Sequence, residues 1–371
     1  MKFNCEKEKL LIGLNSVIRT SVGRTTTPIL EGILLNVKKN NVILTTNDLD
    51  IGMEYTLNGI ETIEEGKVVV DCKMFGDIIR KLPNEQITFY INDKNLLVIE
   101  CEGSVYKLAT MNADEFPILP NIDVEKNITI SQGALKEMIK KTIFAVSVEE
   151  NRPIFTGCLI EVVNDELNVV AVDGFRLALR KARMASGVNA FSAIVPGKYL
   201  NEIVKNLQDI DDVIEIGISK NQALFELKDC KIVTRLLEGD FLNYNSVIPN
   251  EKKTRIKVNK QALQSAIERA AIFSISASEK EKKYPIKIFV SLGSIIISCT
   301  SIGDAKEEVL VETTGEELEI GFNPKYLVDA LKAIEDDEVY LDFGSNISPC
   351  VIRPVIGDKF TYMVLPVRLK E

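Results

Sequence analysis

Two runs of acidic residues have the composition of a divalent-cation site. They are Asp209-Ile210-Asp211-Asp212 and Glu335-Asp336-Asp337-Glu338, and Asn47-Asp48-Leu49-Asp50 is a shorter third candidate. Carboxylate oxygens are the ligands that Mg²⁺ and Ca²⁺ prefer in proteins. The first two runs follow the predicted end of a helix and precede a strand, and the third has the composition of a turn. These positions favour solvated connections, so we predict no metal site.

Histidine is absent from the chain, and the cysteines are scattered. The seven cysteines are Cys5, Cys72, Cys101, Cys158, Cys230, Cys299 and Cys350. Without histidine, Ser-His and Cys-His nucleophile pairs and histidine-ligated metals are excluded. No C-x-x-C pair occurs, so neither a zinc site nor a redox motif is indicated, and we expect reduced core cysteines in a cytoplasmic protein. Carboxylate-based catalysis remains open.

The composition is that of a globular protein with an acidic balance. Of 371 residues, 46% are hydrophobic, and the net charge is −9. The length predicts two or three domains. No run approaches the roughly 18 apolar residues of a membrane-spanning helix, and the charged start at residues 1–7 lacks the apolar core of a signal peptide. We therefore expect no membrane partner, and the negative charge argues against a protein that coats nucleic acid with its whole surface.

The chain repeats itself three times. The segments 1–20, 128–147 and 256–275 each open with a short alternating strand and an amphipathic helix. A Pro-Ile pair follows in each repeat, and later a lysine with two bulky residues after it. These lysines are Lys73, Lys198 and Lys325, spaced 125 and 127 residues apart. With polar linkers near 121–127 and 250–254, the repeat predicts domains at 1–121, 128–249 and 256–371.

Each repeat is predicted to contain two helices and roughly eight strands, an α+β module. Apolar residues at i, i+3, i+4 and i+7 mark the second helices, as in the stripe that begins at Phe75. Asn323-Pro324 is a favourable N-cap followed by Pro at the first helical position. Runs such as 41–46 and 167–172 are β-rich, and Asp173-Gly174 is a candidate turn.

All six predicted helices carry a net positive charge, although the chain as a whole is acidic. One explanation is that lysine is a good helix former. Glutamate forms helices equally well, however, so we favour a positive surface built from helices, with the negative charge elsewhere. Such a surface suits a protein that contacts the DNA backbone without reading its sequence.

Several motifs, taken together in order, resemble one family over the whole chain. They are Met1-Lys2-Phe3, Arg24-Thr25-Thr26-Thr27-Pro28-Ile29-Leu30, Ala113-Asp114-Glu115-Phe116-Pro117, Arg152-Pro153-Ile154, Asp173-Gly174-Phe175-Arg176-Leu177-Ala178 and Leu365-Pro366-Val367-Arg368-Leu369. The chain is similar to the bacterial DNA sliding clamps, the beta subunits of the replicative DNA polymerase III holoenzyme. The resemblance implies a head-to-tail homodimer of three-domain chains that encircles duplex DNA, with helices lining a hole and antiparallel sheets outside. It implies no catalysis and no cofactor. The implied partners are the replicative polymerase catalytic subunit, the clamp loader and other proteins with a clamp-binding motif.

The resemblance also implies three sets of functional residues. The DNA-facing set is Arg24, Lys73, Arg80, Arg152, Lys198, Lys205 and Lys283. The dimer interface is Tyr106, Leu108, Ile272 and Phe273, which have intradomain packing as their alternative role. A peptide-binding cleft is formed by Phe155, Val172, Gly174, Phe175, Arg176, Leu177, Leu242, Val247, Met363, Val364, Leu365, Pro366, Val367 and Arg368.

Helix dimensions favour two chains per ring, once a closed ring is assumed. Helices pack about 8–10 Å apart, so six in a circle leave a hole of only a few ångströms. Twelve leave roughly 20–28 Å, which admits a duplex whose major groove alone is about 12 Å wide.

Three residues depart from some members of the family. Phe175 stands where some clamps have histidine, and Leu242 and Ser246 replace a proline and an arginine at the rim of the cleft. Two other functions remain as alternatives: a carboxylate-dependent nucleic-acid enzyme, and a protein-binding scaffold with no role on DNA.

Overall fold

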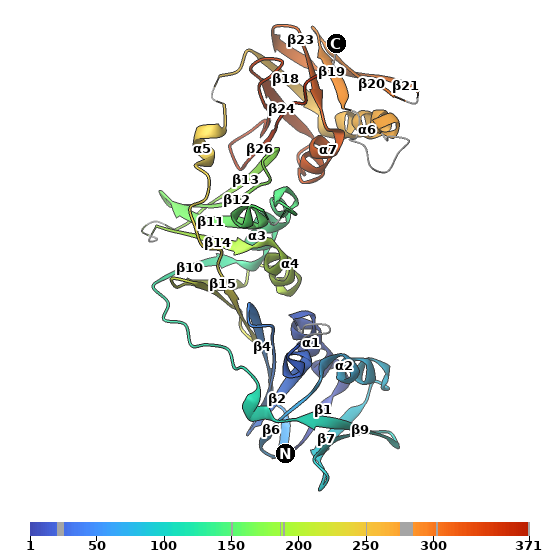
Figure 1. The fold of residues 1–371 in the computed structure, drawn as a ribbon, viewed down its shortest axis with the longest axis vertical. Helices are drawn as coiled ribbons and strands as arrows, with labels where there is room; N and C mark the ends of the chain where they lie inside the picture. Colours follow the sequence, from blue (N-terminus) through green and yellow to red (C-terminus); the bar gives the residue numbers. More distant parts are fainter. Residues whose placement is uncertain are drawn as a thin grey trace. The chain divides into compact units, whose positions relative to one another are not determined.

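The computed structural model describes residues 1–20, 26–149, 151–185, 187, 190–249, 251–274, 285–301 and 303–369. It contains two compact units, which Figure 1 draws with their elements labelled. Unit 1 is Met1–Ala134 with Lys198–Leu236, and unit 2 is Leu135–Gly197 with Leu237–Glu371. The paired strands within both units are antiparallel, and the α+β class predicted from the sequence is confirmed.

Six of the seven α-helices in the described chain recur in pairs, as the sequence repeat predicts, and one short helix is additional. The α-helices of the described chain are α1 (Lys7–Val17), α2 (Cys72–Lys81), α3 (Gln132–Lys140), α4 (Gly197–Asn206), α5 (Tyr244–Val247), α6 (Lys260–Ala270) and α7 (Pro324–Lys332). Short 3-10 helices add η1 (Ile18–Thr20), η2 (Pro28–Glu31), η3 (Ala113–Glu115), η4 (Ile143–Ala145), η5 (Pro153–Thr156) and η6 (Ala271–Ser274). The first helix of every repeat is thus followed by a 3-10 turn, at η1, η4 and η6.

Unit 1 is built on one 13-stranded sheet. Its strands are β1 (Lys2–Glu6), β2 (Gly32–Lys38), β3 (Asn41–Asn47), β4 (Ile51–Asn58), β5 (Glu61–Glu64), β6 (Gly66–Asp71), β7 (Gln86–Ile91), β8 (Leu96–Cys101), β9 (Ser104–Met111), β10 (Lys126–Ser131), β15 (Val213–Ile218), β16 (Gln222–Glu226) and β17 (Cys230–Arg235). Their order is β10-β15-β16-β17-β4-β3-β2-β6-β9-β8-β7-β1-β5. Phe75 of α2 packs on Phe89 of β7, which stacks on Phe3 of β1 with ring centroids 4.6 Å apart.

Unit 2 contains a nine-stranded and a four-stranded sheet. The nine strands are β11 (Gly157–Val163), β12 (Glu166–Val172), β13 (Arg176–Arg183), β14 (Phe191–Pro196), β18 (Thr254–Asn259), β22 (Glu312–Gly315), β24 (Glu338–Phe343), β25 (Cys350–Pro354) and β26 (Phe360–Val364). Their order is β14-β11-β12-β13-β26-β25-β24-β18-β22. The four strands are β19 (Ile286–Val290), β20 (Ser294–Thr300), β21 (Asp304–Leu310) and β23 (Leu318–Phe322), in the order β21-β20-β19-β23.

The helix starts follow from local sequence. Asp71, Asn259 and Asn323 are N-caps whose side chains accept hydrogen bonds from backbone N–H groups of α2, α6 and α7. Such caps satisfy donors that a helix start leaves free, and Pro324 needs no donor at the first position. The predicted Asn323-Pro324 start is confirmed. All seven cysteines are buried and free, as predicted.

The acidic runs serve as connections and ion-pair partners. Glu335 pairs with Lys141 at 2.8 Å, Asp336 with Lys359 at 2.6 Å and Glu338 with Lys257 at 2.9 Å. Asp48 Oδ1 accepts hydrogen bonds from the backbone N–H groups of Asp50 and Ile51, which closes the turn between β3 and β4. These carboxylates are therefore used within the fold.

Candidate functional site

Two strand pairs join neighbouring repeats in the same way. In unit 1, β17 of the second repeat pairs with β4 of the first, with Ile232 opposite Met53. In unit 2, β26 of the third repeat pairs with β13 of the second, with Tyr362 opposite Ala178. Thus the last strand of one repeat extends the sheet of the preceding repeat at each junction.

Four of the predicted DNA-facing residues lie on helices of unit 1, and all four are exposed: Lys73, Arg80, Lys198 and Lys205. Asn206, at the end of α4, donates to the carbonyl of Ser16 in α1 at 3.3 Å, so these helices lie side by side. Lys73 and Lys198 stand in the first turns of α2 and α4.

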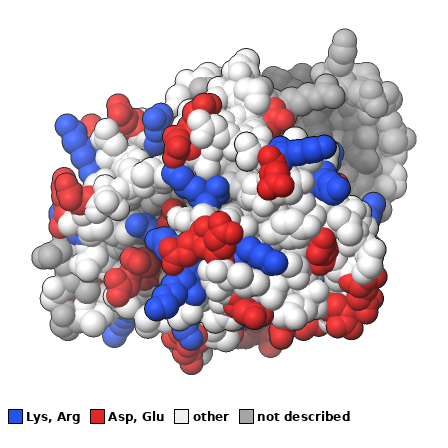
Figure 2. All heavy atoms as spheres, turned by 90° about the horizontal axis from the view of Figure 1, so that it is seen from below, with Lys and Arg blue, Asp and Glu red and all other residues white. Residues whose placement is uncertain are grey.

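The other basic positions differ in their surroundings. Arg80 lies 3.5 Å from Asp77, and Lys205 pairs with Glu202 at 2.6 Å. Arg152 is exposed and lies over the ring of Phe155 in unit 2. Arg24 and Lys283 lie outside the described residues. Basic and acidic side chains lie side by side over the centre of the face drawn in Figure 2.

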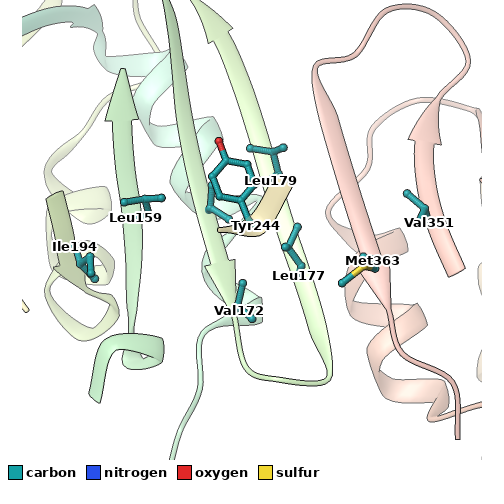
Figure 3. Close-up of a cluster of buried hydrophobic side chains, with 9 residues drawn as sticks. Leu159, Val172, Leu177, Leu179, Ile194, Tyr244, Val351 and Met363 are labelled. Atoms are coloured by element: carbon teal, nitrogen blue, oxygen red, sulfur yellow. The ribbon is translucent and has the colours of Figure 1, made fainter. Parts of the chain in front are cut away.

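An apolar cluster in unit 2 gathers three of the predicted cleft residues. Val172, Leu177 and Met363 are buried together with Tyr244 and Val351, among others. Figure 3 shows the ring of Tyr244 beside Leu177 and Leu179 of β13, while Met363 and Val351 come from β26 and β25 of the next repeat. The cluster therefore spans the junction between the second and third repeats.

Other predicted cleft residues leave apolar surface exposed in the same unit. Phe175 is 55% exposed, Val367 41%, and Leu242 and Val247 37% each. The terminal run is fixed at two points, because the Leu365 N–H donates to the Phe175 carbonyl and the Val367 N–H donates to the Gly321 carbonyl, each at 2.8 Å. Exposed apolar side chains beside a buried cluster are typical of a surface that receives a partner.

The remaining predicted cleft residues lie at the edges of this region. Phe155 is half-buried and contacts Phe241, Gly174 is exposed in the β12–β13 turn with φ of 90°, and Val364 is buried in β26. Pro366 is half-buried and Arg368 exposed.

Arg176, another of the predicted cleft residues, is buried. Its Nε donates to Asp173 Oδ2 at 2.9 Å and its Nη1 to Asp329 Oδ2 at 2.5 Å. The guanidinium lies 4.7 Å from the Tyr326 ring centroid, and that ring stacks on Phe175. Arg176 thus links the β12–β13 turn to α7 and holds the aromatic pair in place.

Removing Asp329 is expected to destabilise unit 2 strongly. In Asp329→Ala, the buried Arg176 charge loses one of its two carboxylate partners and keeps Asp173, so we expect a loss of about 2 kcal/mol in unfolding free energy. The measurement is denaturant unfolding. The control is Asp358→Ala, which removes a 3.5 Å contact between Lys181 and an exposed carboxylate and should cost under about 0.5 kcal/mol. Equal losses of unfolding free energy for both variants would contradict the role of Asp329 as a buried ion-pair partner of Arg176.

The same ion pair gives this contribution a pH dependence. Burial raises the pKa of Asp329, but Lys325 and Arg176 outweigh it, and the pKa is lowered overall. A carboxyl group with a lowered pKa in the folded state stabilises fully above its unfolded value of about 3.9. This contribution is then lost as the pH falls through the lower, folded-state pKa.

The predicted interface residues lie in or near β9 and β21, which take part in neither junction; β9 pairs with β8, and with β6 only at Thr110 and Met111. Tyr106 is 40% exposed in β9 and Ile272 is 62% exposed in η6. Phe273 packs beside Gly303, the residue that precedes β21. Leu108 is buried within unit 1, so its intradomain role is present in the single chain.

Sequence reasoning missed several residues of this apolar cluster. Leu159, Ile194 and Val351 come from strands far apart in the chain, and Tyr244 lies in a short helix without a periodic signal. Leu179 had a usable signal, because it follows Leu177 by two residues and therefore faces the same side of β13.

Comparison with known proteins identifies the family. Residues 1–120, 129–243 and 245–368 match the N-terminal, central and C-terminal domains of the DNA polymerase III beta subunit. The chain is 34% identical to the Bacillus subtilis beta sliding clamp over 377 residues, covering 99% of this chain and 100% of that protein. A Staphylococcus epidermidis beta sliding clamp is also 34% identical over 378 residues, covering 99% of each.

Solved structures agree with this match. The sliding clamp from Bacillus subtilis has a TM-score of 0.94 at 34% identity, with 100% of both chains covered. The Pseudomonas aeruginosa clamp bound to griselimycin has a TM-score of 0.94 at 29% identity, again with 100% coverage of both. The chain belongs to the DNA polymerase III beta subunit family, the beta sliding clamps. The sliding-clamp function expected from the sequence is thereby confirmed.

Proposed function

We propose that two copies of this chain close into a ring around duplex DNA and tether a replicative polymerase to it. The observation that carries this proposal is the repeated strand junction. β17 joins β4 and β26 joins β13, which leaves β9 of the first repeat and β21 of the third without a junction of this kind. Pairing β9 of one copy with β21 of another would make the third junction, and two such junctions close a head-to-tail dimer.

The register of the proposed junction follows from comparing the repeats. In each repeat, a row of residues face one another across three consecutive strands, and the rows can be matched between repeats. In the first repeat, Phe89 faces Ile99, which faces Tyr106. The corresponding rows end at Ile232 in the second repeat and at Tyr362 in the third. Tyr106 therefore corresponds to Ile232 and Tyr362, which face Met53 and Ala178 at the two observed junctions.

The position on β21 follows from contacts with the first helix of each repeat. Tyr55 packs at Gly13 of α1, Arg180 pairs with Glu137 of α3, and Glu307 pairs with Arg269 of α6. Met53 lies two residues before Tyr55, and Ala178 lies two residues before Arg180. The residue two positions before Glu307 is Ala305, so Ala305 is their counterpart in the third repeat. We infer that Tyr106 faces Ala305 of the other copy, which places Lys107 opposite Asp304.

The chemistry of these pairs supports the register. Tyr362 opposite Ala178 is a large residue against a small one, and Tyr106 opposite Ala305 repeats that combination. Phe144 in η4 contacts the Tyr362 ring at 5.6 Å, and Phe273 holds the equivalent place in η6. Lys107 opposite Asp304 adds an opposite-charge cross-strand pair.

The remaining assignments belong to the same proposal. Domains at 1–121, 128–249 and 256–371 would form the six segments of the ring, with the predicted basic residues facing the DNA. The ring would act in the cytoplasm without catalysis, and the clamp loader and polymerase would dock at the cleft. No helix among the described residues is long and apolar enough to cross a membrane.

A designed disulfide tests the ring. Lys107→Cys combined with Asp304→Cys should give a disulfide-linked dimer on mild oxidation, because directly opposed strand residues have Cα atoms about 4.5–5.5 Å apart. The native cysteines are buried and compete little. Non-reducing electrophoresis measures the product.

The matched control is Lys107→Cys with Glu308→Cys, four residues and roughly 13 Å further along β21. It should remain unlinked. A monomer in sedimentation would refute the ring itself. A dimer in which neither pair links, or only the control pair links, would refute the register.

A further inference from the structure

A polar pocket of about 490 Å³ lies on the second repeat, on β11 and β12 and beside the segment before α5. Its lining includes Glu161, Glu166, Asp240 and one cation, Lys181. Lys181 is already engaged, because its Nζ lies 3.3 Å from Glu166 and 3.5 Å from Asp358. The pocket therefore has an excess of negative charge.

Two of its carboxylates have no cationic partner within the part of the chain that the structure describes. Glu161 Oε1 accepts hydrogen bonds from the Tyr244 hydroxyl at 2.5 Å and from Asn168 Nδ2 at 3.5 Å. These are neutral donors, and they hold the carboxylate in position. No ion pair is formed by Asp240 in the same described region.

A buried acceptor in the wall is also unsatisfied. Asn168 is 4% exposed, and its Oδ1 has no hydrogen-bond partner among the described residues. A buried acceptor without a donor is unfavourable, so its presence in a pocket wall indicates a missing donor. A ligand that is positively charged and donates hydrogen bonds would satisfy all three groups, Glu161, Asp240 and Asn168 Oδ1.

The pocket shares its boundary with the apolar cluster of the cleft. Leu159 and Tyr244 belong to that cluster and also line the pocket. Phe241 packs against the cluster and lines the pocket as well. Tyr244 presents its ring to the cluster and its hydroxyl to Glu161. A chain held in the cleft would therefore pass next to the acidic pocket.

We propose that this pocket binds the arginine side chain of a partner peptide whose apolar residues occupy the cleft. The proposal rests on the proposed docking function and adds a second recognition element to it. Arginine fits better than lysine, because a planar guanidinium offers five donors to carboxylates and an amide oxygen spread around one site. A metal ion fits poorly, since no group of three or more Cys, Asp or Glu side chains in the described regions is arranged to hold one.

Matched peptides test the inference on the full-length dimer. The parent peptide has one glutamine and two large apolar residues, and an arginine is placed in turn at each position on either side of them. Each arginine peptide is compared with its citrulline counterpart, which has the same shape without the charge. At one position, arginine should bind about fivefold more tightly at low salt, a modest gain because the pocket is partly solvated.

The double variant Glu161→Gln and Asp240→Asn should abolish that preference and leave citrulline binding unchanged. Glutamine at 161 still accepts from Tyr244, so the fold is preserved. The control Glu317→Gln removes one exposed charge outside the pocket and should keep the preference. If every peptide binds but no position distinguishes arginine from citrulline, the arginine pocket is refuted and the cleft stands. If the parent itself does not bind, both proposals fall.

Discussion

Once loaded on closed circular DNA, the protein should remain bound at salt concentrations that remove it from linear DNA. A ring that encircles the duplex cannot dissociate without opening or reaching an end, whatever the strength of its direct contacts. Gel filtration of DNA-bound protein before and after linearisation measures the effect. Release on cutting, with retention before cutting, is the expected result.

Direct binding should be weak and steeply salt-dependent. Five predicted DNA-facing residues per chain lie within the described regions, and Arg80 and Lys205 already have acidic neighbours. If about five phosphates are neutralised, the slope of log K against log salt is about −4.5. A tenfold rise in salt would then weaken direct binding by roughly 10⁴-fold or more, while topological retention is unaffected.

Two variants separate direct DNA binding from topological retention. Lys73→Gln removes one lysine from each of the two chains, so it should reduce the slope for direct binding by up to about 2 and leave retention on circles intact. The Lys107→Cys and Asp304→Cys dimer, oxidised after loading, should stay on circular DNA even under conditions that dissociate an unlinked dimer. Equal loss from circular and linear DNA as salt rises would show that the protein binds DNA without encircling it.

The repeat made much of the fold predictable from sequence. Helix starts follow from short-range patterns, and Asn323-Pro324 shows this well because cap and first residue are adjacent in the chain. The sliding-clamp class followed from ordered motifs. Both kinds of signal depend on residues close together in sequence or repeated at a fixed period.

The pairing of distant strands was not predictable in the same way. Nothing in β13 specifies that its neighbour is β26, more than 150 residues later, because any apolar antiparallel strand satisfies its hydrogen bonds equally. The role of Arg176 shows the consequence. The resemblance assigned it to the peptide-binding cleft, but no local pattern indicated that Asp329 on α7, 153 residues later, accepts a hydrogen bond from its guanidinium.

Placing a charge on the rim of the cleft should abolish partner binding without affecting the ring. Val247→Asp introduces a carboxylate at a 37% exposed position beside Ile248, which packs against the apolar cluster. Burying that charge against an apolar ligand has no compensating partner, so peptide affinity should fall about 100-fold. Polymerase stimulation on primed circular DNA should fall with it.

Phe175→Asp tests a second position in the predicted cleft. The ring of Phe175 is 55% exposed and stacks on Tyr326 at 6.0 Å, so its outer part is available to a ligand. Because the Arg176 ion pairs do not involve Phe175 side-chain atoms, the fold should be retained. The matched control is Ile356→Asp, which places the same charge at an 87% exposed position in the β25–β26 turn.

A shortened chain gives a further test of docking at the predicted cleft, provided that β26 is kept intact. Removing the chain from Met363 onward would delete the end of a strand that pairs with both β13 and β25, so the domain junction itself would be damaged. Ending the chain after Pro366 instead retains every paired residue of β26 and removes Val367 from the cleft. This variant should stay dimeric and lose most peptide binding. If it and the two aspartate variants stimulate the polymerase as well as Ile356→Asp does, partners dock elsewhere on the clamp.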